Sequence, residues 1–261
     1  MKKYLALSVV ASTLLMAGGD VKPVEPVVEA VEEESVGTFS GQFRAFYIDR
    51  TYSGTLENNR NSLAVGGWVG YDTAEWNGLS LGFKAYGVEG IRIHDGSAPS
   101  LGSASYDPSL YGGGFENYGF FGEAYLKYNG ENTTLKIGRQ KLNTPLAGAD
   151  DARMLPNLFE AAVGSYSGFS DTTLILGHIT QMTVGTFGNV YGDPTANGLA
   201  IQSGYGLGYQ DATSGNFVNA GEVALGAGND TSGTTAGAVV YNGLEGLTLQ
   251  AWEYYAWEIL N

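Results

Sequence analysis

Short runs of alternating apolar and polar residues recur along this chain. In the segment 62–72, Leu63, Val65 and Val69 share one side, whereas small or polar residues occupy the other. Successive side chains of a β-strand point to opposite faces, so each run has one apolar and one polar face. Runs of about ten residues with two such faces suit a sheet that separates lipid from water. The pattern therefore predicts an all-β fold, a transmembrane antiparallel β-barrel.

Nine segments carry this alternation, and connections of two lengths join them. The turn 74–78 ends in Asn-Gly, a strong hairpin signal. Long and short connections alternate, which is typical of outer-membrane barrels with long external loops and short periplasmic turns. An ordinary antiparallel sandwich has no reason to alternate in this way. The predicted strands are 38–48, 62–73, 79–92, 118–128, 133–142, a short strand at 160–166, 172–182, 234–241 and 247–257, and 218–227 could add a small one.

The N-terminus resembles an export signal. Residues 1–19 have a basic start, a short apolar stretch and small residues where cleavage would fall, so we expect a secretory signal peptide. Residues 20–37 are rich in Pro, Val and Glu, and we expect a disordered periplasmic leader there, although 27–34 could form a helical turn or two. The remaining segment, 38–261, is expected to form the barrel.

Composition excludes several other classes of protein. A net charge of −14 argues against binding to nucleic acid, and the absence of cysteine from an exported chain excludes a disulfide framework. The 17 tyrosines, 11 phenylalanines and 4 tryptophans suit the aromatic girdles of a barrel. Trp76, Trp252 and Trp257 are expected in the girdles, whereas Trp68 falls on a small and polar face and could line the lumen.

The predicted strand count indicates an incomplete barrel. Nine strands is an odd number, whereas single-chain bacterial barrels have even counts, and the last strand lacks the aromatic end that such barrels usually have. An open sheet has two unpaired edges, which lipid does not tolerate. We therefore expect this chain to be the N-terminal part of a larger barrel.

Four segments carry a resemblance to the OprD-type outer-membrane porins, especially the forms in sulfur-oxidising and campylobacter-like bacteria. The segment 144–157, Thr-Pro-Leu-Ala-Gly-Ala-Asp-Asp-Ala-Arg-Met-Leu-Pro-Asn, is the most specific. The others are 41–47, 135–140 and 249–257. The resemblance implies an eighteen-stranded barrel, of which these nine strands would be an open half. It also implies passive diffusion of small hydrophilic solutes, often carboxylate-bearing or amino-acid-like, with outer-membrane lipid around the barrel and no cofactor. A homotrimer is left open.

The loop 143–159 is the candidate constriction. It is the third long loop, which folds into the lumen in many porins. Asp150, Asp151 and Arg153 would then set a transverse field across the narrowest part, with Asn157 in the same segment. The alternative is an external loop whose charges meet only water. The resemblance favours the constriction.

Four cationic residues fall on the polar faces of their predicted strands. A charge on the lipid side near mid-bilayer costs about 2–4 kcal/mol, so these side chains are expected to point into the lumen. Together they could form a basic track that guides anionic groups. The alternative is that each cation is paired with a neighbour such as Glu123. The residues of the track are Arg44, Lys84, Lys127 and Lys136.

The sequence offers little that indicates catalysis. His94 and His178 are isolated and do not make a metal site, and no catalytic motif is present. An outer-membrane enzyme of phospholipase type using a serine and His178 is therefore the weaker alternative to a channel. A second alternative is an adhesin or structural surface barrel that does not conduct.

Overall fold

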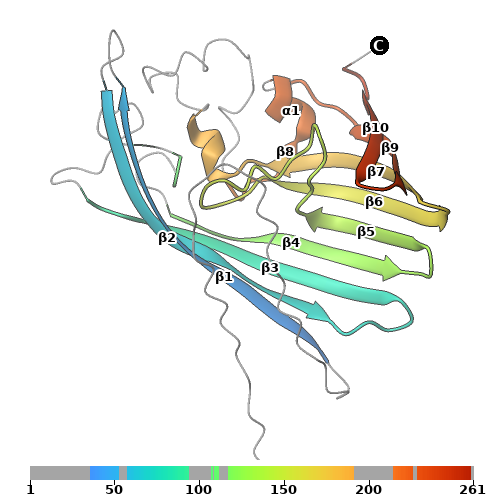
Figure 1. The fold of residues 1–261 in the computed structure, drawn as a ribbon. Helices are drawn as coiled ribbons and strands as arrows, with labels where there is room; N and C mark the ends of the chain where they lie inside the picture. Colours follow the sequence, from blue (N-terminus) through green and yellow to red (C-terminus); the bar gives the residue numbers. More distant parts are fainter. Residues whose placement is uncertain are drawn as a thin grey trace, which may run out of the picture.

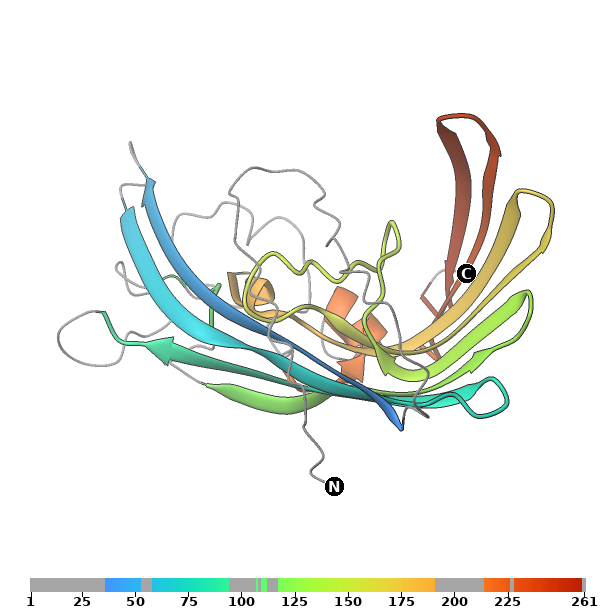
Figure 2. The same ribbon diagram turned by 60° about the horizontal axis from the view of Figure 1, so that its bottom comes forward.

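The computed structural model describes residues 36–52, 58–93, 107, 109–111, 117–190, 214–225 and 228–259. These residues form one open antiparallel sheet, which curves into a trough (Figure 1; Figure 2). The strands are β1 (Gly37–Tyr52), β2 (Asn58–Thr73), β3 (Leu79–Ile91), β4 (Tyr118–Asn129), β5 (Thr133–Gln140), β6 (Leu158–Phe169), β7 (Thr172–Thr183), β8 (Val218–Asn219), β9 (Thr234–Leu244) and β10 (Leu247–Ala256).

The strands follow one another across the sheet in chain order. The order is β1 to β7, then β9 and β10, and the two-residue β8 pairs with the end of β7. Within the described part of the chain, β1 pairs only with β2 and β10 only with β9. The predicted nine-strand open sheet is therefore confirmed. The signal peptide and almost all of the leader lie outside the described residues, as does His94.

The convex face of the trough is apolar, as the alternation predicts. On β1, Phe39 and Phe43 are about three-quarters exposed, at 75% and 73%. Leu81 and Phe83 on β3 lie on the same face and are also exposed. No second layer of the described residues covers this face, so its exposed side chains suit contact with hydrocarbon.

The concave face is filled by loop segments. Residues 107 and 109–111 lie in the long connection between β3 and β4, and Leu110 and Tyr111 are buried. They pack with Tyr86 of β3 and with Met154 and Leu155 from the connection between β5 and β6. The interior of the trough therefore has a small hydrophobic cluster that holds two long loops against the wall.

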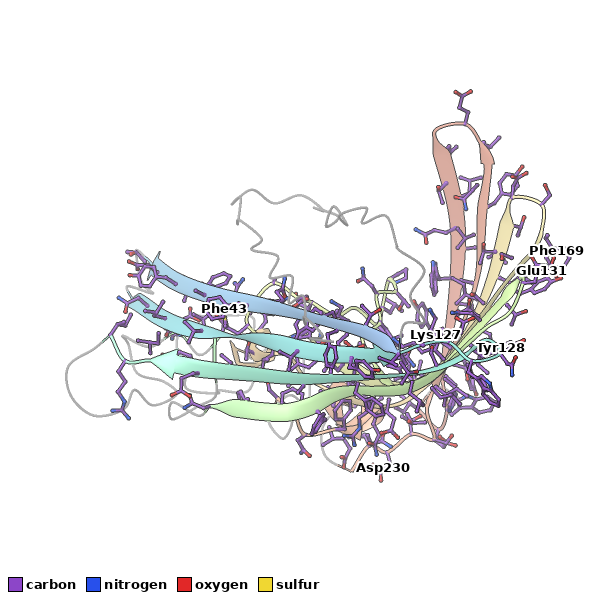
Figure 3. All side chains as sticks on the ribbon, turned by 90° about the horizontal axis from the view of Figure 1, so that it is seen from below. Phe43, Lys127, Tyr128, Glu131, Phe169 and Asp230 are labelled. Carbon is purple, nitrogen blue, oxygen red and sulfur yellow. The ribbon has the colours of Figure 1, made fainter. Side chains whose placement is uncertain are left out.

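Short turns gather at one end of the strands. In Figure 3, Glu131 of the β4–β5 turn and Phe169 at the end of β6 lie at neighbouring hairpin tips. Asn77 and Gly78 of the β2–β3 turn have φ values of 50° and 82°. The Asn-Gly pair is suited to two consecutive positive φ angles, so the predicted hairpin turn is confirmed.

Two predicted element bounds were wrong. β1 and β2 stay paired up to Tyr52 and Asn58, so the first connection is much shorter than expected. The sixth strand is longer than 160–166, because β6 begins at Leu158 and pairs with β7 up to Phe169. The segment 218–227, where an extra strand was left open, begins with the two-residue β8, and a short helix, α1 (Ala220–Leu225), follows it within the described residues 218–225. Among the described residues, no helix is long and apolar enough to span a membrane.

Candidate functional site: a loop across the concave face

Residues 141–157, called the inner loop here, connect β5 to β6 and lie over the concave face of the sheet (Figure 2). The loop begins where β5 ends at Gln140, whose side-chain amide donates to the carbonyl of Ala161 at 3.0 Å. Its far end is fixed by the backbone amide of Leu155, which donates to Thr186 Oγ1 at 3.2 Å. Thr186 begins the short helix η2 (Thr186–Val190). The loop is thus fastened at both ends.

Asp151 joins the inner loop to the first strand of the sheet. The Arg44 guanidinium on β1 donates to both carboxylate oxygens of Asp151, at 2.6 and 2.9 Å, and also to the Arg153 carbonyl at 2.7 Å. Lys141 Nζ lies 3.3 Å from the same carboxylate. A two-pronged pair of this kind fixes direction as well as distance. The loop therefore reaches across the trough and is held to the opposite wall.

The side chain of Arg153 has different partners from that of Asp151. Its guanidinium lies over the rings of Phe46 and Phe187, 5.6 and 5.2 Å from their centres, and its Nε donates to Ser109 Oγ at 3.3 Å. Burial, and next Arg50, lower the pKa of Arg153. Arg153 thus links the inner loop to the β3–β4 connection.

Asp150 lies next to Asp151 in the inner loop, but its carboxyl group is in a less favourable environment for a charge. It adopts a φ of 41°, a left-handed conformation that Asp tolerates better than most residues. Burial raises the pKa of Asp150, with Arg153 opposing the rise and Asp151 adding to it. Asp150 therefore carries its charge less readily than an ordinary carboxyl.

Asn157 holds the base of the loop. Its side-chain amide donates to the Gly148 carbonyl at 3.1 Å, and its Oδ1 accepts from the Gly185 backbone amide at 2.7 Å. Its own backbone amide donates to the Ala149 carbonyl at 2.6 Å. All three hydrogen bonds join Asn157 to backbone groups of neighbouring segments, so Asn157 orders the base of the loop.

Lys84 on β3 and Lys136 on β5 share one carboxylate. Glu123 on β4 lies between them, with Nζ–O distances of 3.1 Å to Lys84 and 3.8 Å to Lys136. Tyr86 also donates its hydroxyl to Glu123, at 2.7 Å. The two ammonium groups rest over aromatic rings as well, Lys84 over Trp68 and Lys136 over Tyr125. The wall is therefore a mixed-charge cluster at this level.

Lys127 completes the four predicted cations. It is paired in register with Lys136 on one side and with Ser80 on the other. Among the described residues, no ion pair is found for Lys127. The structure thus places all four cations on the concave side, with Arg44 held by Asp151 and two lysines sharing Glu123.

Sequence reasoning missed a buried cluster from the β3–β4 connection. Asp107 is 1% exposed and lies 3.4 Å from Arg50 of β1. The Ser62 hydroxyl of β2 donates to the Asp107 carbonyl at 2.8 Å. Asp107 comes from a stretch of Gly, Ser and Pro without periodicity, so nothing in the sequence distinguishes it from a solvated loop residue.

Two of the tryptophan predictions can be compared directly with the structure. The Trp68 indole donates to Gln42 Oε1 at 3.3 Å, so Trp68 lines the concave side as expected. Trp252 was expected in a girdle, but it stacks on Tyr254, whose hydroxyl accepts from the Leu146 amide of the inner loop. Trp252 therefore also faces inward.

The histidine environment does not resemble a catalytic pair. His178 Nε2 lies 3.1 Å from the Ser232 carbonyl, and Nδ1 lies 3.0 Å from Thr235 Oγ1. The Ser232 hydroxyl is bound to Glu258 rather than to His178. Over the described ranges, no group of His, Asp and Glu side chains could hold a metal ion.

A family model described as outer membrane porin, OprD family, matches residues 34–188, which include β1 to β7 and the inner loop. The chain belongs to the OprD family of porins. Proteins of this family are outer-membrane channels of Gram-negative bacteria and not enzymes. Among curated protein sequences, none matches this chain.

Solved porins share the fold at low sequence identity. OccK9 (OpdG) of Pseudomonas aeruginosa superposes with a TM-score of 0.59 at 16% identity, over 85% of this chain and 51% of that one. A BenF-like porin of Pseudomonas fluorescens Pf-5 gives 0.57 at 12% identity, over 85% and 50%. OccAB1 of Acinetobacter baumannii gives 0.55 at 14% identity, over 86% and 46%. The chain spans about half the length of these structures.

Proposed function

We propose that this OprD-family chain forms the wall and the constriction of a passive diffusion channel for small hydrophilic solutes. The observation that carries the proposal is the bond between Arg44 and Asp151, which holds the inner loop across the concave face. A loop held in this way narrows any lumen that the full barrel encloses. An external loop in water would have no reason to reach β1.

Solutes that carry a carboxylate suit this wall best. Lys127 and Arg153 present cationic groups on the concave side, and a cationic wall raises the local concentration of anions. The structure of OpdK from Pseudomonas aeruginosa was solved with vanillate, a carboxylate, and superposes with a TM-score of 0.53 at 13% identity over 82% of this chain and 46% of that one. This likeness supports the solute class only by analogy.

Asp150 and Asp151 with Arg153 form the proposed constriction, with Asn157 ordering its base. The field across the opening would run between the incompletely neutralised Asp150 and the guanidinium of Arg153, because Asp151 is already engaged by Arg44 and Lys141. Arg44, Lys84, Lys127 and Lys136 form the proposed basic track, weakened where Glu123 neutralises part of it. Selection would then depend on both pore width and wall charge.

Liposome swelling tests the channel. The full-length protein, reconstituted into liposomes, is expected to admit small sugars, amino acids and benzoate, with rates that fall steeply as solute size rises. An adhesin or structural barrel would give no swelling above that of protein-free liposomes. An enzyme of phospholipase type would release fatty acids from the liposomes and lose that activity in His178→Ala, whereas a channel would swell the liposomes equally with and without this substitution.

Two further parts of the proposal concern export and assembly. Residues 1–19 would be removed as a signal peptide and 20–37 would remain as a periplasmic leader, which N-terminal sequencing of the mature protein tests. Assembly as a homotrimer in outer-membrane lipid is tested by chemical cross-linking in native membranes. A band at the monomer position alone would reject the trimer.

A further inference from the structure

Glu123 reaches its position because of a local irregularity in β4. The pairing of β3 with β4 shifts register between Lys84 and Ala85, which face Glu123 and Phe121. Phe121 points outward and is 68% exposed, whereas Glu123 is 1% exposed on the inner side. Residues two apart on a regular strand share a face, so the extra residue, Gly122, is what allows Phe121 and Glu123 to face opposite ways.

Only glycine fits at this irregularity. A Cβ atom on Gly122 would lie 2.5 Å from Leu158 Cδ1 and 2.6 Å from the ring of Tyr86. Bulges are known to re-aim a side chain beside functional sites. The bulge here directs a carboxylate between two lysines of a wall whose other nearby carboxylate, Asp72, accepts from the Tyr125 hydroxyl at 2.6 Å.

Three polar partners hold the side chain of Glu123 in this position. Two ammonium groups and one hydroxyl converge on its two oxygens, and the side chain of Glu123 is only 2% exposed, against 20% and 25% for those of Lys84 and Lys136. A solute passing along the wall would therefore meet the lysines rather than the carboxylate. The cluster of two lysines and Glu123 contributes a net charge of +1 instead of +2.

We propose that Glu123 is a specificity-determining residue of the pore wall, which halves the charge of the Lys84–Lys136 pair and thereby limits the preference of the channel for anions. The inference rests on the channel function proposed above. Glu123 would lower the preference of the channel for anions, whereas the lysines on either side of it would raise that preference. The basic track is thereby divided into a neutralised part at Glu123 and a part at Lys127, for which no ion pair is found among the residues the structure describes.

The test is the reversal potential of single channels in planar lipid bilayers under a potassium chloride gradient at low ionic strength. Glu123→Gln in the full-length protein is expected to raise the anion-to-cation permeability ratio about tenfold. One unit charge about 6 Å from a passing ion in a water-like dielectric changes the occupancy of that ion about threefold, and anions and cations respond in opposite directions. Lys84→Met is expected to lower the ratio by a similar factor. Glu123→Asp keeps the charge and is expected to retain the wild-type ratio.

Glu253→Gln is the matched control. Trp252 and Tyr254 face inward, so Glu253 between them faces outward on β10. Its removal changes the net charge of the chain by the same amount and is expected to leave the ratio unchanged. Lys84→Met keeps the test decisive should Glu123→Gln fail to fold, because the two substitutions predict shifts of opposite sign.

Three results would overturn the assignment. Conducting Glu123→Gln channels with the wild-type ratio would show that the carboxylate does not influence the passing ion. An equal shift in Glu253→Gln would show a general effect of net charge. A wild-type protein that folds without conducting would instead reject the channel function, and the role of Glu123 with it.

Discussion

Separating Arg44 from Asp151 is expected to release the inner loop. The two side chains are 16% and 24% exposed and are joined by two charge-assisted hydrogen bonds. Exposed ion pairs contribute about 0.2–1 kcal/mol, and breaking a buried pair costs about 3–5 kcal/mol. For this partly exposed pair with two hydrogen bonds we expect a coupling free energy between these limits, of about 2 kcal/mol, which corresponds to an increase of roughly 30-fold in the opening equilibrium of the loop.

Amide hydrogen exchange of Asn157 measures this opening. Its backbone amide donates to the Ala149 carbonyl at 2.6 Å, so it exchanges only when the loop comes away from its base. A double-mutant cycle of Arg44→Met and Asp151→Asn, made in the full-length protein in detergent micelles, gives the coupling directly. We expect the exchange rate to rise roughly 30-fold in either single variant, with little further increase in the double variant.

Lys141→Met provides the control for this cycle. Lys141 reaches the same carboxylate with one contact of 3.3 Å, but its side chain is 43% exposed. Its removal is expected to change the exchange rate by about threefold or less. A coupling free energy near zero, or a Lys141→Met effect as large as that of Arg44→Met, would refute the view that Arg44 holds the loop.

Three other changes test the wall and the loop. Because burial raises the pKa of Asp150, the cation permeability of the wild-type channel should fall as pH drops through that raised pKa. Asparagine tolerates the same backbone conformation, so Asp150→Asn should remove this transition from reversal potentials measured against pH, and a transition that persists would belong to another group. Gly122→Ala should lower the free energy of unfolding, measured by urea titration, by about 1–3 kcal/mol. Gly119→Ala on the same strand should be tolerated, because a Cβ atom there meets no atom within 4 Å, and equal effects of the two substitutions would contradict the requirement for glycine at the bulge. Ile137→Lys on the convex face of β5 should make the free energy of folding into lipid vesicles about 2–4 kcal/mol less favourable, whereas Thr134→Lys on the concave face should change it far less. Similar changes for the two variants would mean that the two faces have been assigned wrongly.

The alternation of side chains was sufficient to predict the sheet. Phe43 and Arg44 show why, since neighbouring positions on β1 differ so strongly in polarity that only one orientation suits a membrane. The extents of β1 and β2 were underestimated because their polar ends, around Arg50 and Arg60, lack the apolar positions that marked the rest. Continued backbone pairing, which no side-chain pattern reports, holds those ends together.

The contacts of the candidate site were less accessible to sequence reasoning than its residues. Asp151 and Arg153 were identified together, yet in the structure they face different partners, Arg44 for one and Ser109 with two phenylalanines for the other. Those partners are distant in sequence, and their meeting depends on the path of the loop across the trough. The bulge at Gly122 was also unforeseen, since a glycine within a strand allows many conformations and indicates none in particular.

The reach of the inner loop to β1 also constrains how the molecule is built. Arg44 and Asp151 are 107 positions apart, and the four strands β2 to β5 lie between them in the chain, so we expect their contact to form only after these strands have paired. A partly assembled sheet would thus lack the proposed constriction, which would form as a late step. Any defect that keeps the first strand from docking would leave a wider and less discriminating opening, even with every residue of the loop intact.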